Sequence, residues 1–386
     1  MRKFSIMKIL VTGAKGFIGR NLCLTLEQTP DIEVLKYDLG DEAKLDNYLA
    51  ECDFVMHLAG VNRPKDPAEF KTGNTVFTED ILDKLAARSN PPPVLLSSSI
   101  QAALDNDYGK SKAAAEGAVR AYGMKTGAPT FIYRLANVFG KWCRPNYNSA
   151  VATWVYNIAR GLPIMVRDPD ATVTLVYVDD VVRSFISHVE RVETYRDNES
   201  TRSIRLNDFL SVSPSYTKTL GEIVELIKSF HDEPKTLMVP DQADGFTKKL
   251  YSTYLAALPE DQFSYLLTMH CDSRGSFTEA LHSSERGQVS VNVSKPGITK
   301  GQHWHHTKHE KFLVVSGEGE INFRMADDPE APIITYRVSG GKLEIVRIPP
   351  GYTHNIVNVG NSDMVTLMWA NEVFDPANPD TFRLEV

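Results

Sequence analysis

A histidine-rich stretch, HWHHTKHE at residues 303–310, is the densest group of potential metal ligands in this 386-residue sequence. His303 and His305 are two positions apart, so both point to the same side of a strand. Glu310 and the later His354, in PPGYTHNIVN, can reach the same place from neighbouring strands. Three neutral imidazole nitrogens and one carboxylate oxygen suit a divalent cation such as Zn(II), Fe(II), Mn(II) or Ni(II). The alternative is a histidine-rich strand that only lines a polar pocket.

A second group of reactive side chains is the stretch YGKSK, which places Tyr108 and Lys112 four residues apart. On a helix this spacing puts both side chains on one face. A nearby ammonium lowers the pKa of a phenol, and we therefore expect Tyr108 to act as an acid or base in interconverting an alcohol and a ketone. Taken alone, the pair fits an ordinary surface helix better.

A spaced glycine triplet, Gly13, Gly16 and Gly19 in VTGAKGFIG, follows an apolar run directly. Glycines allow a tight turn and a close approach of the backbone to a pyrophosphate, whose charge suits the amides at a helix N-terminus. Asp38 ends the second apolar run, where a carboxylate favours the ribose of NAD, whereas Lys15 and Arg63 could attract the extra phosphate of NADPH. The charges alone leave both cofactors open.

The elements that position these residues fall into two regions with different sequence patterns. From Lys8 to Ile223, apolar runs alternate with helical patterns, which predicts an α/β doubly wound parallel sheet covered by helices. After Phe263, short strands separated by Gly and Pro predict an all-β sandwich or barrel. We therefore expect two domains, residues 1–258 and 259–386, which also suits the chain length.

Composition limits the partners of the chain. The formal net charge of -7 argues against nucleic-acid or anionic-membrane binding, and no run of about 18 apolar residues suggests a membrane span. The N-terminal MRKFSIMKILVTGAKG lacks a cleavage site typical of a signal peptide. Four dispersed cysteines without a CxxC pair suggest neither disulfides nor a thiolate zinc site, so we expect a cytoplasmic protein.

Over residues 8–230 the order of the motifs HLAG, LLSSS, YGKSK, YRLANVFG and VYVDD after the glycine triplet resembles the extended short-chain dehydrogenase/reductases, which have a Rossmann-type fold. The resemblance implies that Tyr108 donates a proton, Lys112 holds the nicotinamide ribose, Ser99 contacts the substrate oxygen and Asn74 supports the proton relay. It also implies a wider set of cofactor-binding residues: Gly13, Lys15, Gly16, Phe17, Ile18, Gly19, Asp38, Leu58, Ala59, Arg63, Tyr108 and Lys112.

Three departures from the family pattern concern the ligands. Tyr108 follows Ser99 by only nine positions, so the loop that covers the sugar is short. The segment between EVLKYD and DFVMHLAG has room for one helix but not for the usual extra strand. The arginine usual before VYVDD is absent, so other residues are expected to bind the nucleotide sugar: Asn137, Lys141, Arg144, Asn146 and Arg167.

The spacing around the histidine-rich stretch, from Gly297 to Gly317, and the later PPGYTHNIVN are similar to the two motifs of the cupin family, a double-stranded β-helix or jelly-roll barrel. This resemblance implies His303, His305, Glu310 and His354 as the metal ligands. His306 and His309 fall outside the pattern and are expected to be exposed or to lie next to the ligands.

Over nearly its full length the sequence resembles the CapF/WbjC type of bifunctional capsule and O-antigen enzymes, through HLAGVNRP, FGKWCRPNYNS, LYSTYLAALP and KPGITKGQHWHHTK. The resemblance implies a C-terminal C3-epimerase and an N-terminal NADPH-dependent C4-reductase acting on a UDP-linked 6-deoxy-4-keto-N-acetylhexosamine, with Zn(II) in the cupin and a homodimer. Three other interpretations stay open: a cupin that only binds the sugar, an iron dioxygenase, and an N-terminal epimerase or dehydratase with retained NAD.

Overall fold

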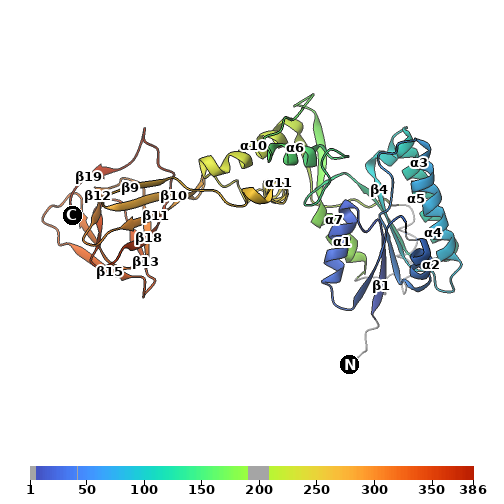
Figure 1. Cartoon of the computed structure of the whole chain (residues 1–386), viewed down its shortest axis with the longest axis horizontal. Helices are drawn as coiled ribbons and strands as arrows, with labels where there is room; N and C mark the ends of the chain where they lie inside the picture. The colour runs from blue at the N-terminus through green and yellow to red at the C-terminus, as the bar shows by residue number, and fades with distance from the viewer. Residues whose placement is uncertain (1–5, 41, 190–207) are drawn as a thin grey trace. The chain divides into compact units, whose positions relative to one another are not determined.

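The computed structural model describes residues 6–40, 42–189 and 208–386, and the chain divides into two compact units (Figure 1). The first unit comprises Met1–Ile227 and Lys249–Leu258, and the second comprises Lys228–Lys248 and Pro259–Val386. The domain boundary after residue 258 stays a proposal, because residues 228–248 group with the second unit.

The N-terminal region and the segments that follow it contain these elements: β1 (Met7–Thr12), α1 (Phe17–Glu27), β2 (Ile32–Tyr37), α2 (Glu42–Glu51), β3 (Phe54–His57), α3 (Ala68–Phe70), η1 (Lys71–Val76), α4 (Phe77–Ala86), β4 (Val94–Ser99), η2 (Ile100–Ala103), α5 (Asp107–Thr126), β5 (Thr130–Leu135), β6 (Asn137–Phe139), α6 (Ala150–Ile158), β7 (Thr172–Tyr177), α7 (Val178–Val189), β8 (Ser215–Thr219), α10 (Leu220–Thr236) and α11 (Gly245–Leu255). The C-terminal region contains η3 (Glu260–Gln262), β9 (Met269–Asp272), β10 (Gly275–Ser283), β11 (Gly287–Ser294), β12 (Thr299–Trp304), β13 (Glu310–Ser316), β14 (Glu318–Met325), β15 (Ile334–Ser339), β16 (Ile345–Ile348), β17 (Tyr352–Asn358), β18 (Met364–Ala370) and β19 (Phe382–Arg383).

The first unit is built on a parallel sheet with strand order β2-β1-β3-β4-β5. The strands are apolar on both faces, as a sheet covered on both sides requires. On β1, Ile9 and Val11 pack against α1 and α7, whereas Leu10 belongs to the cluster formed with α2, α4 and α5. The predicted doubly wound α/β fold is therefore confirmed.

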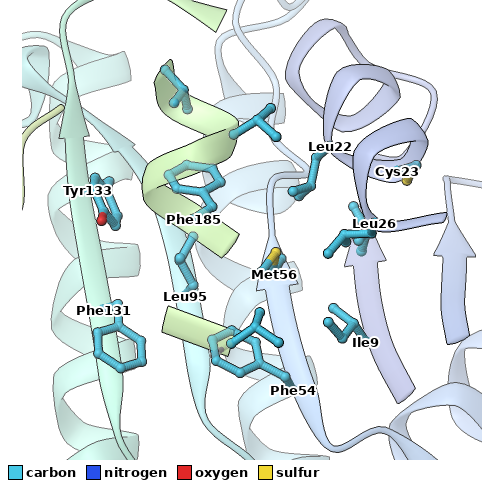
Figure 2. Packing of buried hydrophobic residues seen from close by; sticks show 14 of the residues in the cluster. Ile9, Leu22, Cys23, Leu26, Phe54, Met56, Leu95, Phe131, Tyr133 and Phe185 are labelled. Atoms are coloured by element: carbon cyan, nitrogen blue, oxygen red, sulfur yellow. The ribbon is translucent and has the colours of Figure 1, made fainter. Parts of the chain in front are cut away.

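The cluster beneath α1 and α7 is shown in Figure 2. Leu22 and Leu26 of α1 and Phe185 of α7 lie over Met56 of β3. Between β2 and β3 the described residues form one helix, α2, and no strand, as the sequence indicated. A smaller sheet, β6-β7-β8, continues the unit.

The second unit contains two antiparallel sheets, ordered β16-β13-β18-β11-β10-β9 and β15-β14-β17-β12-β19. Their inner faces share one apolar cluster, in which Phe312 and Val346 of the first sheet meet Ile321 and Ile356 of the second. Two sheets packed in this way form the predicted cupin-like β-barrel.

Helix α10 begins with a capping box. The backbone N–H of Thr219 donates to Glu222 Oε2 at 2.8 Å, and the Glu222 N–H donates to Thr219 Oγ1 at 3.1 Å. Of the helices within the described ranges, none combines the length and apolar character needed to cross a bilayer.

Ile321 provides a test of the barrel core because its side chain is fully buried. We expect Ile321→Ala to lower the free energy of unfolding of the second unit by about 2–5 kcal/mol, since a cavity replaces buried methyl groups. Ile345→Ala is the matched control, because Ile345 is 60% exposed and its loss should change the stability by less than about 0.5 kcal/mol. Denaturant titration followed by tryptophan fluorescence measures both, and equal effects would contradict this core.

Candidate functional site

The four predicted metal ligands converge in the barrel of the second unit. His303 comes from β12, His305 follows that strand, Glu310 begins β13 and His354 lies on β17. One potential ligand atom from each residue lies within 4.8 Å of all the others. His305 Nε2 and His354 Nε2 lie 3.6 Å and 3.4 Å from Glu310 Oε2. The structure thus brings the predicted set together.

A β-bulge at Gln302 turns His303 toward this cluster. Lys300 pairs with Ile356 on the inner face, and His303 pairs with His354 on the same face, although an odd number of positions separates Lys300 from His303. Strand residues alternate between faces, so one extra residue is needed, and Gln302, with a φ of 64°, supplies it. The bulge therefore determines whether the first histidine of the motif faces inward.

The ligand atoms are buried and lack other partners. Within the described part of the chain, His305 Nε2, Glu310 Oε2 and His354 Nε2 have no hydrogen-bond partner. Burial lowers the pKa of His303 to about 4, and His354 adds to the shift. Although burial opposes it, contact with His305 and His354 holds the pKa of Glu310 well below its ordinary value. Three imidazole side chains and an ionised carboxylate fit a divalent cation.

The residues around the ligands include two that were predicted and one that was not. His306 and His309 are exposed, as predicted. Asp380 was not predicted: its backbone oxygen lies 2.6 Å from His305 Nδ1. Seventy-five positions separate the two residues, and no spacing rule links them. A turn-like Asn-Pro-Asp sequence at residues 378–380 was the only available signal.

In the first unit the glycine turn joins β1 to α1 as expected. Gly13 has a φ of +71°, and a Cβ there would lie 2.8 Å from the backbone nitrogen of Ala59. A Cβ on Gly19 would lie 2.1 Å from the oxygen of Gly13. The turn is therefore packed too closely for side chains, and the first amides of α1, at Phe17 and Ile18, follow it directly.

Beside this turn is a cavity of about 830 Å³, a volume typical of a cofactor pocket. Its lining includes Lys15, Arg20, Lys36 and Lys44 as well as Asp38. The Asp38 carboxylate accepts a hydrogen bond from the backbone N–H of Lys15 at 2.6 Å. Four cations in the lining suit an anionic nucleotide, although Lys36 forms an ion pair with Glu27, which also lines the cavity.

Three further predicted cofactor residues, Leu58, Ala59 and Arg63, lie after β3. The N–H groups of Leu58 and Ala59 donate to Thr12 Oγ1, at 3.2 Å and 3.3 Å, which joins this segment to the end of β1. Arg63 is exposed, and the structure does not bring it into the lining of the cavity.

Ser99 ends β4, and Tyr108 lies in the first turn of α5, which Asn106 caps by accepting the Gly109 N–H at 2.7 Å. Lys112 is 6% exposed, and its Nζ lies 6.0 Å from the centre of the Tyr108 ring. The Nζ donates to the backbone oxygen of Ser97 at 3.2 Å. The three side chains therefore meet at the C-terminal end of a parallel strand, where open α/β sheets bind ligands.

The expected lowering of the Tyr108 pKa by Lys112 is wrong in this structure. Burial raises the pKa of Tyr108 above its ordinary value, and a hydrogen bond with Ser99 opposes this only in part. The same burial lowers the pKa of Lys112 to about 8, opposed by Glu116. At neutral pH Tyr108 keeps its proton and is suited to donate it to a ketone oxygen.

Asn74 lies in a π-helical turn, η1, next to Lys112. Its side chain accepts the Val61 N–H at 2.7 Å and donates to Ser111 Oγ at 3.0 Å. A Cβ on Gly60 would lie 2.9 Å from Asn74 Oδ1 and 3.1 Å from Lys112 Nζ, so this glycine lets the two polar groups approach. Single π-helical turns frequently occur at functional sites.

The predicted substrate-binding residues are spread over a longer region. Asn137 begins β6, and Lys141 forms an ion pair with Asp179 at 2.5 Å. Arg144 lies over the ring of Tyr147, with 5.2 Å to its centre. Asn146 has a φ of 53°, and Arg167 is exposed. The structure does not gather these five side chains into one cluster, so their role stays a prediction.

Comparisons with known proteins agree with both units. Residues 9–201 match the model of the NAD dependent epimerase/dehydratase family, and residues 270–382 match the polysaccharide biosynthesis C-terminal domain. The chain is 45% identical to UDP-2-acetamido-2,6-beta-L-arabino-hexul-4-ose reductase of Pseudomonas aeruginosa, over 98% of this chain and 99% of that protein.

Among solved structures, capsular polysaccharide assembling protein CapF from Staphylococcus aureus matches with a TM-score of 0.88 and 49% identity, over 98% of this chain and 100% of that chain. UDP-glucuronic acid 4-epimerase from Bacillus cereus matches with a TM-score of 0.53 and 17% identity, over 65% and 99% of the chains, which supports the fold alone.

The burial of Lys112 predicts a pH-dependent effect on stability. Its pKa is about 8 in the folded protein and about 10.5 in the unfolded chain, so the unfolded state binds more protons between these values and stability rises with pH there. We expect Lys112→Met to stabilise the protein by about 1–2 kcal/mol at pH 7, because removing the buried charge gains more than losing the hydrogen bond to Ser97 costs. The gain should be smaller at pH 10.

Lys110→Met is the matched control on the same helix, because Lys110 is exposed and forms only a surface ion pair with Asp105. Denaturant titration at pH 7 and pH 10 measures both variants. A gain for Lys112→Met that does not fall with pH would contradict the assignment of a buried ammonium.

Proposed function

The chain belongs to the NAD dependent epimerase/dehydratase family and carries a polysaccharide biosynthesis C-terminal domain, and from this premise we propose that it is a bifunctional nucleotide-sugar enzyme. The proposed substrate is a UDP-2-acetamido-2,6-dideoxy-4-hexulose. The second unit inverts C3, and the first unit reduces C4 to give UDP-N-acetyl-6-deoxy-talosamine, on the route to UDP-N-acetyl-L-fucosamine and surface polysaccharide. The relatives support a UDP-sugar reductase or epimerase in capsule synthesis.

The observation that carries the proposal is that one chain holds two separate polar constellations: a protonated tyrosine beside a buried ammonium, and four converging metal ligands. A ketone reduction needs a proton donor at the carbonyl oxygen. A C3 inversion needs stabilisation of an enolate. Neither constellation supplies both.

In the reduction, C4 would receive a hydride from the nicotinamide of a bound cofactor. Ser99 holds the ketone oxygen and Tyr108 donates its proton to that oxygen as the alcohol forms. Lys112 keeps a positive charge near the phenolate that remains, and the Asn74 and Ser111 side chains connect the site to further polar groups. The raised pKa of Tyr108 suits this direction of the reaction, because the donor must be protonated beforehand.

In the epimerisation, His303, His305, Glu310 and His354 would hold a divalent cation, with zinc as the proposed metal. The cation supplies charge stabilisation for an enolate oxygen. The buried nitrogens of His305 and His354 and the ionised carboxylate fit this group, because buried lone pairs without a hydrogen-bond partner are costly.

Four further features belong to the proposal. The cofactor is NADPH, supported by the basic residues around the cavity beside Asp38, although this carboxylate also suits NAD. The nucleotide sugar is contacted by the five side chains named above: Asn137, Lys141, Arg144, Asn146 and Arg167. The enzyme is a homodimer and is cytoplasmic, as the family likeness suggests.

A pair of variants separates the two activities. We expect Tyr108→Phe to reduce NADPH oxidation with the keto sugar about 10²–10⁴-fold, because the proton donor is lost. Deuterium uptake from D₂O at C3 should persist in this variant. His354→Ala should give the reverse result, because it should lose bound zinc and C3 exchange. It should still oxidise NADPH when it is given keto sugar that the Tyr108→Phe variant has already epimerised.

Three results would reject parts of the proposal. Wild-type NADPH oxidation by Tyr108→Phe would exclude the reductase assignment. Unchanged C3 exchange in His354→Ala would leave the barrel as a binding module only. Turnover without net NADPH oxidation would favour an epimerase or dehydratase with retained NAD.

A further inference from the structure

We propose that Asp380 is a positioning residue that holds the cation site in shape, an inference that rests on the proposed metal binding by the barrel. Asp380 is none of the four ligands, yet both its backbone and its side chain bind the chain that carries them. Its backbone oxygen contacts His305, and its carboxylate accepts hydrogen bonds from the segment between His305 and Glu310.

The backbone contact fixes the tautomer of His305. A carbonyl oxygen can only accept, so His305 Nδ1, 2.6 Å from Asp380 O, must carry the hydrogen. The lone pair is then on Nε2, which lies 3.6 Å from Glu310 Oε2 inside the cluster. Such outer contacts commonly orient metal-binding histidines and strengthen metal binding.

The carboxylate fixes the connecting segment. It accepts the N–H groups of His306, Thr307 and Lys308 at 2.9, 2.8 and 2.8 Å, and the Thr307 hydroxyl at 3.1 Å. These hydrogen bonds outweigh the opposing effect of desolvation and hold the pKa of Asp380 well below its ordinary value. One carboxylate thus holds the whole turn that joins two ligands.

The residues after Asp380 extend this contact to the other ligand strands. Arg383 pairs with His303, and the Leu384 N–H donates to the oxygen of Gln302, the bulge residue, at 3.0 Å. Thr353, next to His354, donates from its hydroxyl to the Leu384 oxygen at 2.5 Å. All three histidine ligands are therefore braced by one seven-residue segment, 380–386.

The test is zinc affinity of the full chain, measured by competition with a chromophoric chelator. We expect Asp380→Asn to weaken zinc binding about 10–100-fold, because one acceptor oxygen becomes an NH₂ group that faces backbone N–H donors. Asparagine tolerates the positive φ of 39° at this position, so the backbone can be kept. Asp375→Asn is the matched control in the same loop, since Asp375 accepts only the Ala377 N–H with its side chain.

Two readouts distinguish positioning from general stability. In Asp380→Asn the rise in thermal midpoint on adding zinc should shrink, and the visible absorption spectrum of the Co(II) form should differ from that of the wild type. A lower midpoint of the metal-free protein with unchanged zinc affinity would overturn the inference. A wild-type chain that binds no zinc would instead reject the proposed metal site. Asp380→Gly, which tolerates the same φ, provides a second variant if Asp380→Asn does not fold.

A different observation supports a second inference: we infer that Glu279 and His282 form the base that removes the C3 proton in the proposed epimerisation. A second β-bulge, between Glu279 and Leu281, puts both side chains on the inner face although they are three positions apart. His282 pairs with Gln288, Gln288 pairs with Ala370, and Ala370 pairs with Glu310. His282 thus lies in the same cross-strand row as a metal ligand, with Gln288 and the small Ala370 between them.

The pair has the chemistry of a base. His282 Nε2 is buried without a hydrogen-bond partner among the described residues, and it lies 3.7 Å from Glu279 Oε2. The backbone of His282 is fixed, because its N–H donates to the Leu237 oxygen at 2.8 Å and its oxygen accepts the Val239 N–H at 2.9 Å. The imidazole takes the C3 proton, the C–H electron pair forms a C3=C4 bond, and the carbonyl π pair moves onto O4. When C4=O4 re-forms, the C3=C4 pair takes a proton from solvent water on the opposite face of C3, and the imidazolium neutralises the hydroxide left behind.

The experiment measures C3 deuterium uptake of the zinc-loaded full chain in D₂O. We expect His282→Ala to slow uptake about 10²–10⁴-fold, Glu279→Gln to slow it less, and added imidazole to restore part of the His282→Ala rate. Both variants should keep the zinc content of the wild type. They should also oxidise NADPH at the wild-type rate on keto sugar that the Tyr108→Phe variant has already epimerised. His270→Ala on the exposed strand β9 is the matched control. Wild-type exchange in His282→Ala would overturn this inference, whereas absent exchange in the wild type would reject the proposed epimerase function.

Discussion

The structure depends on one constraint: polar side chains must be buried close together although they do not satisfy all of one another's hydrogen-bonding capacity. In the barrel, three imidazoles and a carboxylate converge within 4.8 Å, and several of their ligand atoms have no partner in the described structure. Such a cluster is unfavourable alone, because buried lone pairs lose hydration. It persists because two packed sheets and a shared apolar cluster fix the strands that carry it. The fold thus maintains a geometry that could hold a bound cation.

The parallel-sheet unit solves the same problem with different residues. Lys112 is 6% exposed and has no carboxylate in hydrogen-bond contact among the contacts described, so its pKa falls to about 8. Gly60, which has no side chain, leaves the space in which Asn74 and Lys112 lie side by side. Burial also keeps the Tyr108 phenol protonated. Desolvation is thus the main cause of the pKa shifts of Tyr108, Lys112 and His303, whereas contact with two histidines keeps Glu310 ionised against desolvation.

How much of this could be predicted from the sequence differs between local and long-range features. The glycine turn, the pairing of Tyr108 with Lys112 and the alternation of His303 and His305 depend on local spacing, and the structure places them as expected. The Tyr108 pKa shift was predicted with the wrong sign, because burial depends on tertiary packing that spacing does not report. Asp380 was missed for the same reason, since its partners lie more than seventy positions away. The bulge at Gln302 has no sequence rule of its own and becomes visible only when strand pairs are assigned.

The interior of the barrel also bears on whether the second unit is only a structural module. A strand buried for packing alone would present apolar side chains inward, as β13 and β14 do with Phe312 and Ile321. Strand β11 instead turns Ser290 and Asn292 inward, both 2% exposed, and Lys300 donates to Asn292 Oδ1 at 2.7 Å. Polar groups on the inner face replace apolar packing, so their presence in the barrel that carries the ligand cluster favours a barrel built to hold a polar molecule. A unit selected only to support the reductase would gain stability by replacing them with valine or leucine.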